Sequence, residues 1–244
     1  MSDTRDSKTY IVRKLADGNC WMVQNLDLDL KNNVTLTSAN TDLNSKTTWT
    51  PQYSTQTTAG TTWAENGGDV ARSMDPGNIY FPGGTGSGTA GRYENFQGAT
   101  SGQPWEHIGN YYNWYAATAG SGIASMWNDG VNDVARDSIC PKGWRLSPVM
   151  TGEYLIQDVY MLDNNDAGAA KALQFPLNHV RSGYYSYYDG NIYHQGYSGS
   201  WWSPIAGGSN ANAFYIVNQN PNRLDPRFQN RKGFGLSIRC VCPT

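Results

Sequence analysis

The sequence predicts a single α+β domain, rich in loops and short antiparallel strands. Three observations favour this class. A strand–turn–strand pattern opens the chain, a segment with helical spacing follows residue 150, and an alternating apolar run closes it. Strands at both ends with one or two helices between them fit an α+β arrangement. A single unit of 244 residues is of ordinary size, so we expect one domain over 1–244.

The first element is a β-hairpin. Two alternating runs, at 10–15 and 20–26, flank Ala16-Asp17-Gly18-Asn19. Asp-Gly between such runs is a strong turn signal. The next stretch, 31–102, is rich in Thr, Ser, Asn and Gly, and predicts long loops or ragged strands rather than helices.

Two apolar segments follow. Residues 109–120, GNYYNWYAATAG, are aromatic enough to predict burial, and 139–148 read as a compact strand that ends at Pro148. The helical spacing comes next, over 152–162, where five apolar residues can share one broad face: Tyr154, Leu155, Val159, Met161 and Leu162.

Thr151 is the expected N-cap of this helix, with Glu153 in its first turn. A second short helix is predicted over 167–173. The closing segment predicts a half-buried strand, because its apolar residues alternate with small or polar ones. These apolar residues are Phe234, Leu236 and Ile238.

The composition excludes several classes. The net charge is −2 without a basic block, which argues against nucleic-acid binding, and no apolar run is long enough to span a bilayer, so we expect no membrane contact by this segment. Four cysteines permit two disulfides. We expect Cys140 to join the C-terminal strand through Cys240 or Cys242; free buried thiols are the alternative. Disulfides would place the protein outside the cell or on its surface, and we expect a leader or anchor to have preceded Met1.

Catalytic and metal signals are weak, so the sequence predicts no enzyme. The only histidines are His107, His179 and His194, and no common catalytic or nucleotide-binding motif occurs. The run DNNDAG at 163–168 lacks the full calcium-loop spacing. Asp129, Asp133 and Asp137 indicate turns and a solvated edge. No cofactor is expected, although a structural calcium ion stays open.

The most informative stretch runs from Gly183 to Trp202. It holds six tyrosines and two tryptophans among Gly, Ser, Asp and Asn, and no Lys or Glu occurs between Lys171 and Lys232. One interpretation is that the rings belong to the core. However, successive side chains of an extended segment point to opposite faces, so some phenols must face outward. Tyr, Ser, Gly and Asn with few Lys or Glu are typical of binding surfaces, and Arg223, Arg227 and Arg231 extend this pattern.

Four segments together resemble one family. DTRDSKTYIVRKLADGNCWMVQNLDL, YYNWYAATAG, SICPKGWRLSP and GFGLSIRCV are similar to segments of the Fibrobacter succinogenes major paralogous domain. The resemblance implies a C-type-lectin-like fold of the formylglycine-generating-enzyme branch. The region 180–241 also resembles the variable region of proteins that retroelements diversify by mutating adenines. Such mutation does not yield Lys or Glu, which agrees with their absence here.

The resemblance implies a ligand-binding face at these variable positions: Tyr187, Tyr188, Tyr193, His194, Tyr197, Ser198, Ser200, Gly207, Gly208, Asn210, Tyr215, Asn218, Asn220, Asn222, Arg223, Asp225, Arg227 and Phe228. Trp201, Trp202, Gln195 and Gln229 are expected to be fixed scaffold, with Trp202 as a fixed member of the face.

Cys242 and Pro204 depart from the family pattern, and Pro204 is expected to reshape the loop around it. The expected function is recognition or adhesion, with an unknown protein or glycan as ligand. An oxidase of the formylglycine-generating type and a glycan-binding surface module are the alternatives. Cys240 and Cys242 lie too close in sequence to copy the cysteine pair of that oxidase, so its activity is not carried over.

Overall fold

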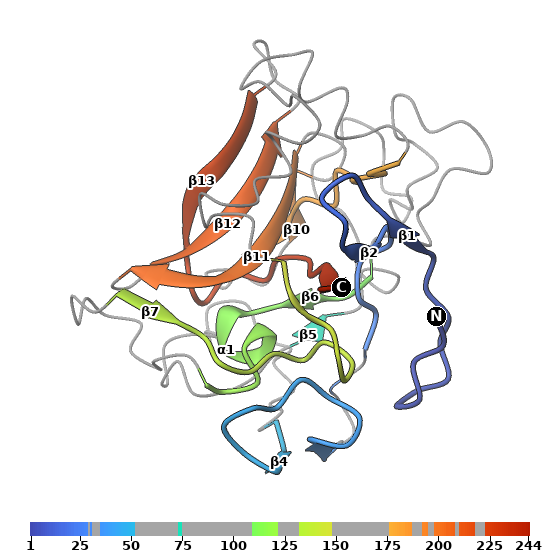
Figure 1. Cartoon of the computed structure of the whole chain (residues 1–244). Coiled ribbons are helices and arrows are strands. Elements are labelled where there is room, and N and C mark those ends of the chain that lie inside the picture. The colour runs from blue at the N-terminus through green and yellow to red at the C-terminus, as the bar shows by residue number, and fades with distance from the viewer. Residues whose placement is uncertain are drawn as a thin grey trace, which may run out of the picture.

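Strands and loops dominate the chain. The computed structural model describes residues 1–28, 30, 35–51, 73–74, 109–121, 132–147, 176–186, 192–194, 198–207, 210–217 and 223–244. In this part of the chain the strands form small antiparallel sheets, with a single short helix (Figure 1). The strand-rich, loop-rich class that the sequence predicts is confirmed at this level. The two predicted helices, over 152–162 and 167–173, lie outside the described residues.

A four-stranded sheet joins the two ends of the chain. Its order is β1 (Val12–Lys14), β2 (Cys20–Met22), β14 (Cys240–Cys242) and β8 (Arg145–Leu146). The predicted hairpin is confirmed, with β1 paired to β2. Its turn places Gly18 at φ +85°, a conformation that glycine adopts without steric cost. Because β14 pairs with β2, the last strand of the chain holds the first hairpin by main-chain hydrogen bonds.

The longest strands form a second, strongly curved sheet (Figure 1). Its order is β13 (Arg223–Arg231), β12 (Asn210–Val217), β11 (Ser198–Gly207) and β7 (Asn132–Val134). The loop expected around Pro204 is therefore a strand. The register shifts between Trp202 and Ala206, and such irregularities are where sheets accommodate proline. The Pro204 carbonyl still accepts a hydrogen bond from the Ala135 amide, at 2.8 Å.

Three two-stranded pairs complete the strands. They are β3 (Leu36–Thr37) with β4 (Thr48–Trp49), β5 (Ser73–Met74) with β6 (Tyr111–Tyr112), and β9 (Tyr184–Tyr185) with β10 (Ile192–Tyr193). The short helix α1 (Trp114–Ala117) follows β6 directly. Asn113 caps it, since its side-chain oxygen accepts a hydrogen bond from the Ala116 amide at 2.9 Å.

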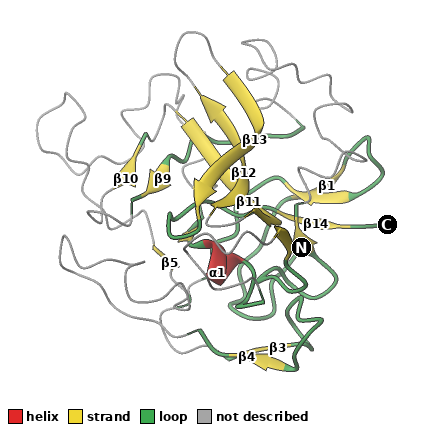
Figure 2. Ribbon diagram, turned by 90° about the vertical axis from the view of Figure 1, so that its left-hand side faces the viewer, coloured by secondary structure: helices red, strands yellow, loops and turns green. Residues whose placement is uncertain are grey.

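The core lies between the two larger sheets and around α1 (Figure 2). The predicted burial of 109–120 is confirmed, because the side chains of Tyr111, Tyr112 and Trp114 are fully buried. Tyr112 and Trp114 pack with apolar residues of the N-terminal third and with Trp202 of β11. The core therefore joins segments from the start, middle and end of the chain.

The closing segment differs from the predicted half-buried strand. Residues 235–237 form isolated bridges to three separate segments: Gly235 to Tyr185, Leu236 to Tyr112, and Ser237 to Trp201. The continuous strand begins only at Cys240. Neighbours on both sides bury the polar residues Ser237 and Arg239 as well as the apolar ones. Alternation alone could not reveal this, because it assumes that one face meets solvent.

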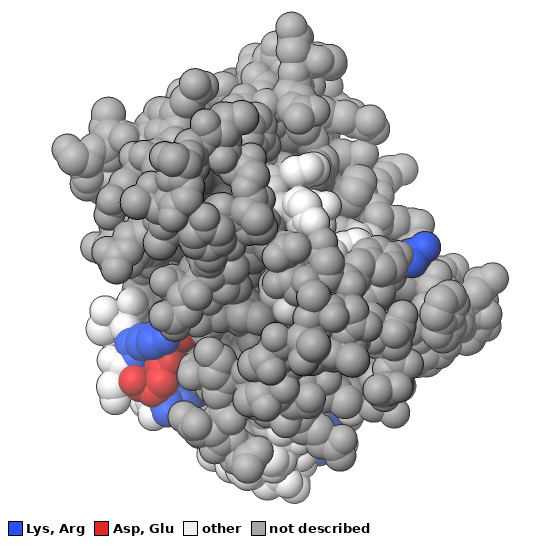
Figure 3. Space-filling model, turned by 180° about the vertical axis from the view of Figure 1, so that it is seen from behind, with Lys and Arg blue, Asp and Glu red and all other residues white. Residues whose placement is uncertain are grey.

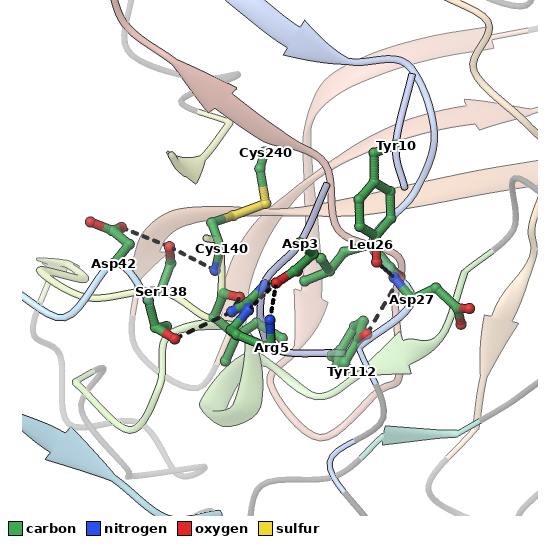
Figure 4. Close-up of a disulfide and its surroundings, with 12 residues drawn as sticks. Asp3, Arg5, Tyr10, Leu26, Asp27, Asp42, Tyr112, Ser138, Cys140 and Cys240 are labelled. Carbon is green, nitrogen blue, oxygen red and sulfur yellow. Dashed lines mark hydrogen bonds and ion pairs between the residues drawn. A yellow bond between two sulfur atoms is a disulfide. The ribbon is translucent and has the colours of Figure 1, made fainter. Parts of the chain in front are cut away.

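One disulfide links the middle of the chain to β14. Cys140 bonds to Cys240, with the two Cα atoms 5.8 Å apart (Figure 4). This confirms the first of the two expected partners and excludes free thiols at these positions. Next to the disulfide, Arg5 donates a hydrogen bond to the Ile139 carbonyl at 2.6 Å and forms a buried ion pair with Asp3. The N-terminus is thereby fixed to the same point.

Asp137 is not on a solvated edge, as the sequence analysis expected, but is 1% exposed. Its carboxylate accepts hydrogen bonds from the amides of Asn44, at 2.5 Å, and Ser45, at 2.7 Å. Lys46 lies 3.5 Å away. This carboxylate therefore organises the loop before β4, a role that the spacing of aspartates did not indicate. Asp129 and the run at 163–168 lie outside the described residues.

Candidate functional site

The candidate site is built on the β9–β10 hairpin. Tyr184 lies directly opposite Tyr193, and Tyr185 lies opposite Ile192. Directly opposite residues of an antiparallel pair place their side chains on the same face. Tyr184 and Tyr193 accordingly stack, with ring centroids 5.8 Å apart and 28° between the planes. Gly183, at φ +71°, turns the chain into this hairpin.

Four rings gather here, and we call them the aromatic cluster: Tyr184, Tyr193, His194 and Phe234. Tyr184 is the centre, with its ring 5.3 Å from both His194 and Phe234 in edge-to-face geometry. Each such contact stabilises by about 0.5–1.5 kcal/mol beyond the area that it buries. These ring contacts therefore order the surface of the cluster.

The aromatic cluster is displayed at the surface but anchored in the core. Tyr193 is 37% exposed and His194 is also exposed, while Tyr184 and Phe234 are half-buried and pack against core residues. Tyr185 exchanges two main-chain hydrogen bonds with Gly235, at 2.8 and 2.9 Å. These bonds hold the hairpin against the closing segment, so the outer rings stand on a fixed base.

His194 occupies an unusual backbone conformation, with φ +60°. Its carbonyl accepts a hydrogen bond from the Ser198 amide at 2.9 Å, which leads the chain from the hairpin into β11. Partial desolvation lowers the pKa of the His194 imidazole. At neutral pH the ring is therefore uncharged and acts as a flat, weakly polar contact surface.

The strand that follows the hairpin, β11, is tightly packed. The indole N–H of Trp202 donates to the Tyr112 carbonyl at 2.7 Å, and that of Trp114 donates to the Ser203 carbonyl at 3.0 Å. At Gly199 an added Cβ would lie 2.4 Å from the Val180 carbonyl oxygen, so only glycine fits there. The close approach at Gly199 and the two indole hydrogen bonds hold the backbone of β11 in place.

A buried polar network fixes the chain just before the hairpin. Asn25 accepts hydrogen bonds from the Trp201 indole at 2.7 Å and from Arg239 Nε at 3.0 Å. The Arg239 guanidinium also donates to the carbonyls of Leu177 and Asn178. Burial lowers the pKa of Arg239. The network ties four separate segments of the chain together and positions the start of the aromatic stretch.

His179 is buried in the same interior. Its ring lies 4.6 Å from that of Trp201. Burial, reinforced by the nearby positive charge of Arg239, holds its pKa well below the usual value. The imidazole is therefore neutral. The third histidine, His107, lies outside the described residues.

The expected binding positions fall into three groups, and the first contains the positions whose side chains the structure describes. Tyr193 and His194 lie at the surface in the aromatic cluster. Three others are buried, with exposed fractions of 1% or less: Ser198, Ser200 and Trp202. A ligand cannot reach them in this conformation, so we remove them from the candidate face. Along this part of β11, β12 pairs on one side, and bridges from Gly199 to Gly183 and from Trp201 to Ser237 lie on the other.

For a second group, the structure describes only the backbone. These positions lie on the curved sheet: Gly207, Asn210, Tyr215, Arg223, Asp225, Arg227 and Phe228. The register brings Ser200, Tyr215 and Asp225 into one row across β11, β12 and β13. The third group lies outside the described residues: Tyr187, Tyr188, Tyr197, Gly208, Asn218, Asn220 and Asn222.

Sequence reasoning missed two members of the aromatic cluster, Tyr184 and Phe234. Tyr184 was part of the aromatic stretch but was not selected as a binding position. Phe234 was assigned to the interior of the closing strand, and its contact with Tyr184 joins segments far apart in the sequence. A local pattern carries no signal for such a contact.

The described part of the chain shows neither a metal site nor a membrane-spanning helix. Within the described ranges, no group of three or more His, Cys, Asp or Glu residues could hold a metal ion, and no helix is long and apolar enough to cross a membrane. On the face opposite to that of Figure 1, described acidic and basic side chains lie side by side at one edge (Figure 3). Comparisons with protein-family models, curated proteins and solved structures find no match for this chain.

Proposed function

We propose that this protein is a non-catalytic ligand-binding protein, with a C-type-lectin-like fold, that recognises a protein outside the cell. The aromatic cluster is the observation that carries the proposal. Partly exposed tyrosines on a rigid base give a large contact area and lose little side-chain entropy on binding. Such rings, with depleted Lys and Glu around them, are typical of the residues that dominate binding energy.

The division between base and surface supports recognition of varied ligands. Main-chain hydrogen bonds between Tyr185 and Gly235, and the packing of Tyr184 and Phe234 against the core, hold the backbone of the hairpin. The disulfide, the buried network around Asn25 and the packing of Trp202 stabilise the rest of the frame. The exposed rings contribute little to that frame. Residues at the surface can therefore change without unfolding the domain, which is the usual separation of binding loops from a scaffold.

Diversification by a retroelement is part of the proposal. It rests on the composition of 180–241, where Lys and Glu are missing up to Lys232. The genomic surroundings test it. We expect a near-copy of the DNA that encodes 180–241, which differs from it at adenines, beside a gene for a reverse transcriptase. Flanking DNA without such a copy would remove diversification and leave the binding proposal standing.

Binding is tested with immobilised protein. Wild-type protein, Tyr193→Ala and Ile11→Ala are exposed in parallel to extracellular protein extracts and to a glycan array. Ile11 is the control, because it is an exposed apolar residue, 44% accessible, beside β1, on the side of the molecule away from β9 and β10 (Figure 2).

We expect one or more proteins to be retained by wild type and by Ile11→Ala, with at least about tenfold weaker binding to Tyr193→Ala, as for a residue at the centre of an interface. Equal retention by all three forms would contradict the proposed site. Binding on the glycan array alone, lost in Tyr193→Ala, would replace the protein ligand with a sugar, since exposed rings also stack on sugars.

A further inference from the structure

Two cysteines with free thiols lie directly opposite each other where β2 meets β14. Cys20 and Cys242 are register partners in this antiparallel pair, and neither takes part in the Cys140–Cys240 disulfide. The sequence separation between them is almost the whole chain. Only the pairing of the first hairpin with the last strand brings them together.

Their positions suit a disulfide without movement of the backbone. Directly opposite residues of antiparallel strands have Cα atoms about 4.5–5.5 Å apart and side chains on the same face. Disulfides span Cα separations of about 4.4–6.8 Å. The cross-strand separation therefore falls inside the range that a disulfide requires.

The register of this pair is held from both sides. On one side Val241 lies opposite Trp21, and both side chains are buried. On the other side the Thr244 hydroxyl donates a hydrogen bond to the Gly18 carbonyl at 2.9 Å. A slip by one residue would break both contacts and turn Trp21 toward the opposite face. The two thiols are thus kept in register.

The two cysteine pairs differ in access. Cys140 and Cys240 are fully buried, whereas Cys20 and Cys242 are half-buried. A small oxidant can therefore reach the second pair in the folded protein. A thiolate attacks a disulfide through a mixed-disulfide intermediate, so access to one of the two sulfurs is enough to begin the exchange.

We propose that Cys20 and Cys242 form a second disulfide when the protein meets a low-molecular-mass disulfide such as oxidised glutathione. One thiolate attacks the oxidant, forms a mixed disulfide and releases one reduced thiol. The other thiolate then attacks the protein sulfur of that mixed disulfide and releases the second reduced thiol. Two protein thiols are oxidised and one external disulfide is reduced to two thiols, with the two protons taken up by the leaving thiolates.

With this bond, two disulfides would hold β14, through Cys240 and through Cys242. Cys240 already joins β14 to the segment at 139–140, and Cys242 would join it to β2. The covalent loop from Cys20 to Cys242 would enclose nearly the entire chain. Closing such a loop stabilises mainly by restricting the unfolded state. The inference is independent of the proposed ligand-binding function.

The test uses full-length protein in which Cys140–Cys240 is formed and the other two thiols are reduced. It is incubated with oxidised glutathione, digested without reduction and mapped by mass spectrometry. We expect a linked peptide that contains Cys20 and Cys242, and a melting temperature raised by roughly 5–10 °C. Mild reduction should reverse this rise before the buried disulfide opens.

Three variants test whether the disulfide requires both Cys20 and Cys242 in this register. Cys20→Ser and Cys242→Ser should each stop at a glutathione adduct, with no rise in melting temperature. The matched control combines Lys14→Cys with Cys20→Ser. Lys14 is exposed and lies opposite Cys20 on β1, one strand further from Cys242, so its thiol lies about 10 Å away and out of reach.

That control should give two separate adducts. Two separate glutathione adducts on the wild-type protein, or thiols that stay free in saturating oxidant, would overturn the proposal. So would a linked peptide that joins Cys242 to Cys140. Because peptide mapping of the wild-type protein needs no substitution, this outcome does not depend on whether the variants fold.

Discussion

The ring of Tyr193 stacks on the ring of Tyr184 with 5.8 Å between centroids, across the two strands of a short hairpin. The inner ring packs against the core and the outer ring meets solvent. This contact connects the buried frame, which ends at Tyr184, with the exposed face, which begins at Tyr193.

Tyr193 and Tyr185, which lie on the two strands of the hairpin, should respond very differently to truncation. Tyr193→Ala removes one stacked, partly exposed ring and should lower the free energy of unfolding by less than about 1.5 kcal/mol. Tyr185 is 3% exposed, so Tyr185→Ala should cost about 3–5 kcal/mol through lost burial and a cavity. Urea denaturation of both variants measures the difference, and equal losses would place Tyr193 in the core.

Substitutions at Ser200 test whether this position of β11 tolerates a large side chain, as a position on a binding face would. It is 1% exposed, and its hydroxyl has no hydrogen-bond partner in the described part of the chain. Ser200→Ala should therefore change the stability by no more than about 0.5 kcal/mol. Ser200→Tyr should cost more than about 3 kcal/mol, because the buried site has no room for a ring. A Ser200→Tyr protein that melts like wild type would restore Ser200 to the candidate face.

Asn25 is the shared acceptor of two buried donors, Trp201 Nε1 and Arg239 Nε. Asn25→Ala should leave both donors unsatisfied and cost about 2–5 kcal/mol. Asn25→Asp keeps an acceptor oxygen and adds a negative charge beside Arg239, so it should cost clearly less. Thermal melts of the two variants check this order; a milder effect of Asn25→Ala would show that the network contributes little.

Asp137 should give the protein part of its acid sensitivity. Burial alone would raise the pKa of this carboxyl, but hydrogen bonds from Ser45 and Asn44 and the Lys46 ammonium outweigh burial and lower it. A carboxyl whose pKa is lower in the folded state stabilises above the unfolded pKa of about 4, and this contribution is lost as the pH falls toward the folded pKa.

We therefore expect the free energy of unfolding to fall below about pH 4, and less steeply in Asp137→Asn. The same variant should be less stable by about 1–3 kcal/mol at pH 7, because an amide cannot accept all of these hydrogen bonds. Chemical denaturation at several pH values measures both effects. Parallel pH profiles for the two proteins would contradict this role of Asp137.

The sequence predicted those parts of the fold that depend on residues close together in the chain. The Asp17-Gly18 turn specified the first hairpin, and the aromatic density of 109–120 specified burial. The curved sheet could not be predicted in the same way. Its strands contain Gly, Asn, Ser and Pro204, which are residues that normally mark turns, and they are strands only because each has a neighbour to pair with.

The candidate site was predicted only in part for the same reason. Tyr193 and His194 were selected through the resemblance to a variable region, but the anchoring by Phe234 depends on a tertiary contact. The burial of Ser198 and Ser200 did carry a signal. On a regular strand both share a face with Trp202, which was expected to be scaffold, so the period-two rule would have placed them inside.

Exposure of Tyr193 on a rigid base is the central claim, and chemical modification of tyrosines in the folded protein tests it most directly. A water-soluble nitrating reagent followed by peptide mapping should modify Tyr193 while Tyr111, Tyr112 and Tyr185 react only after unfolding. If Tyr193 is protected as fully as Tyr185 in the native protein, the hairpin does not present its ring to a ligand and the account is wrong.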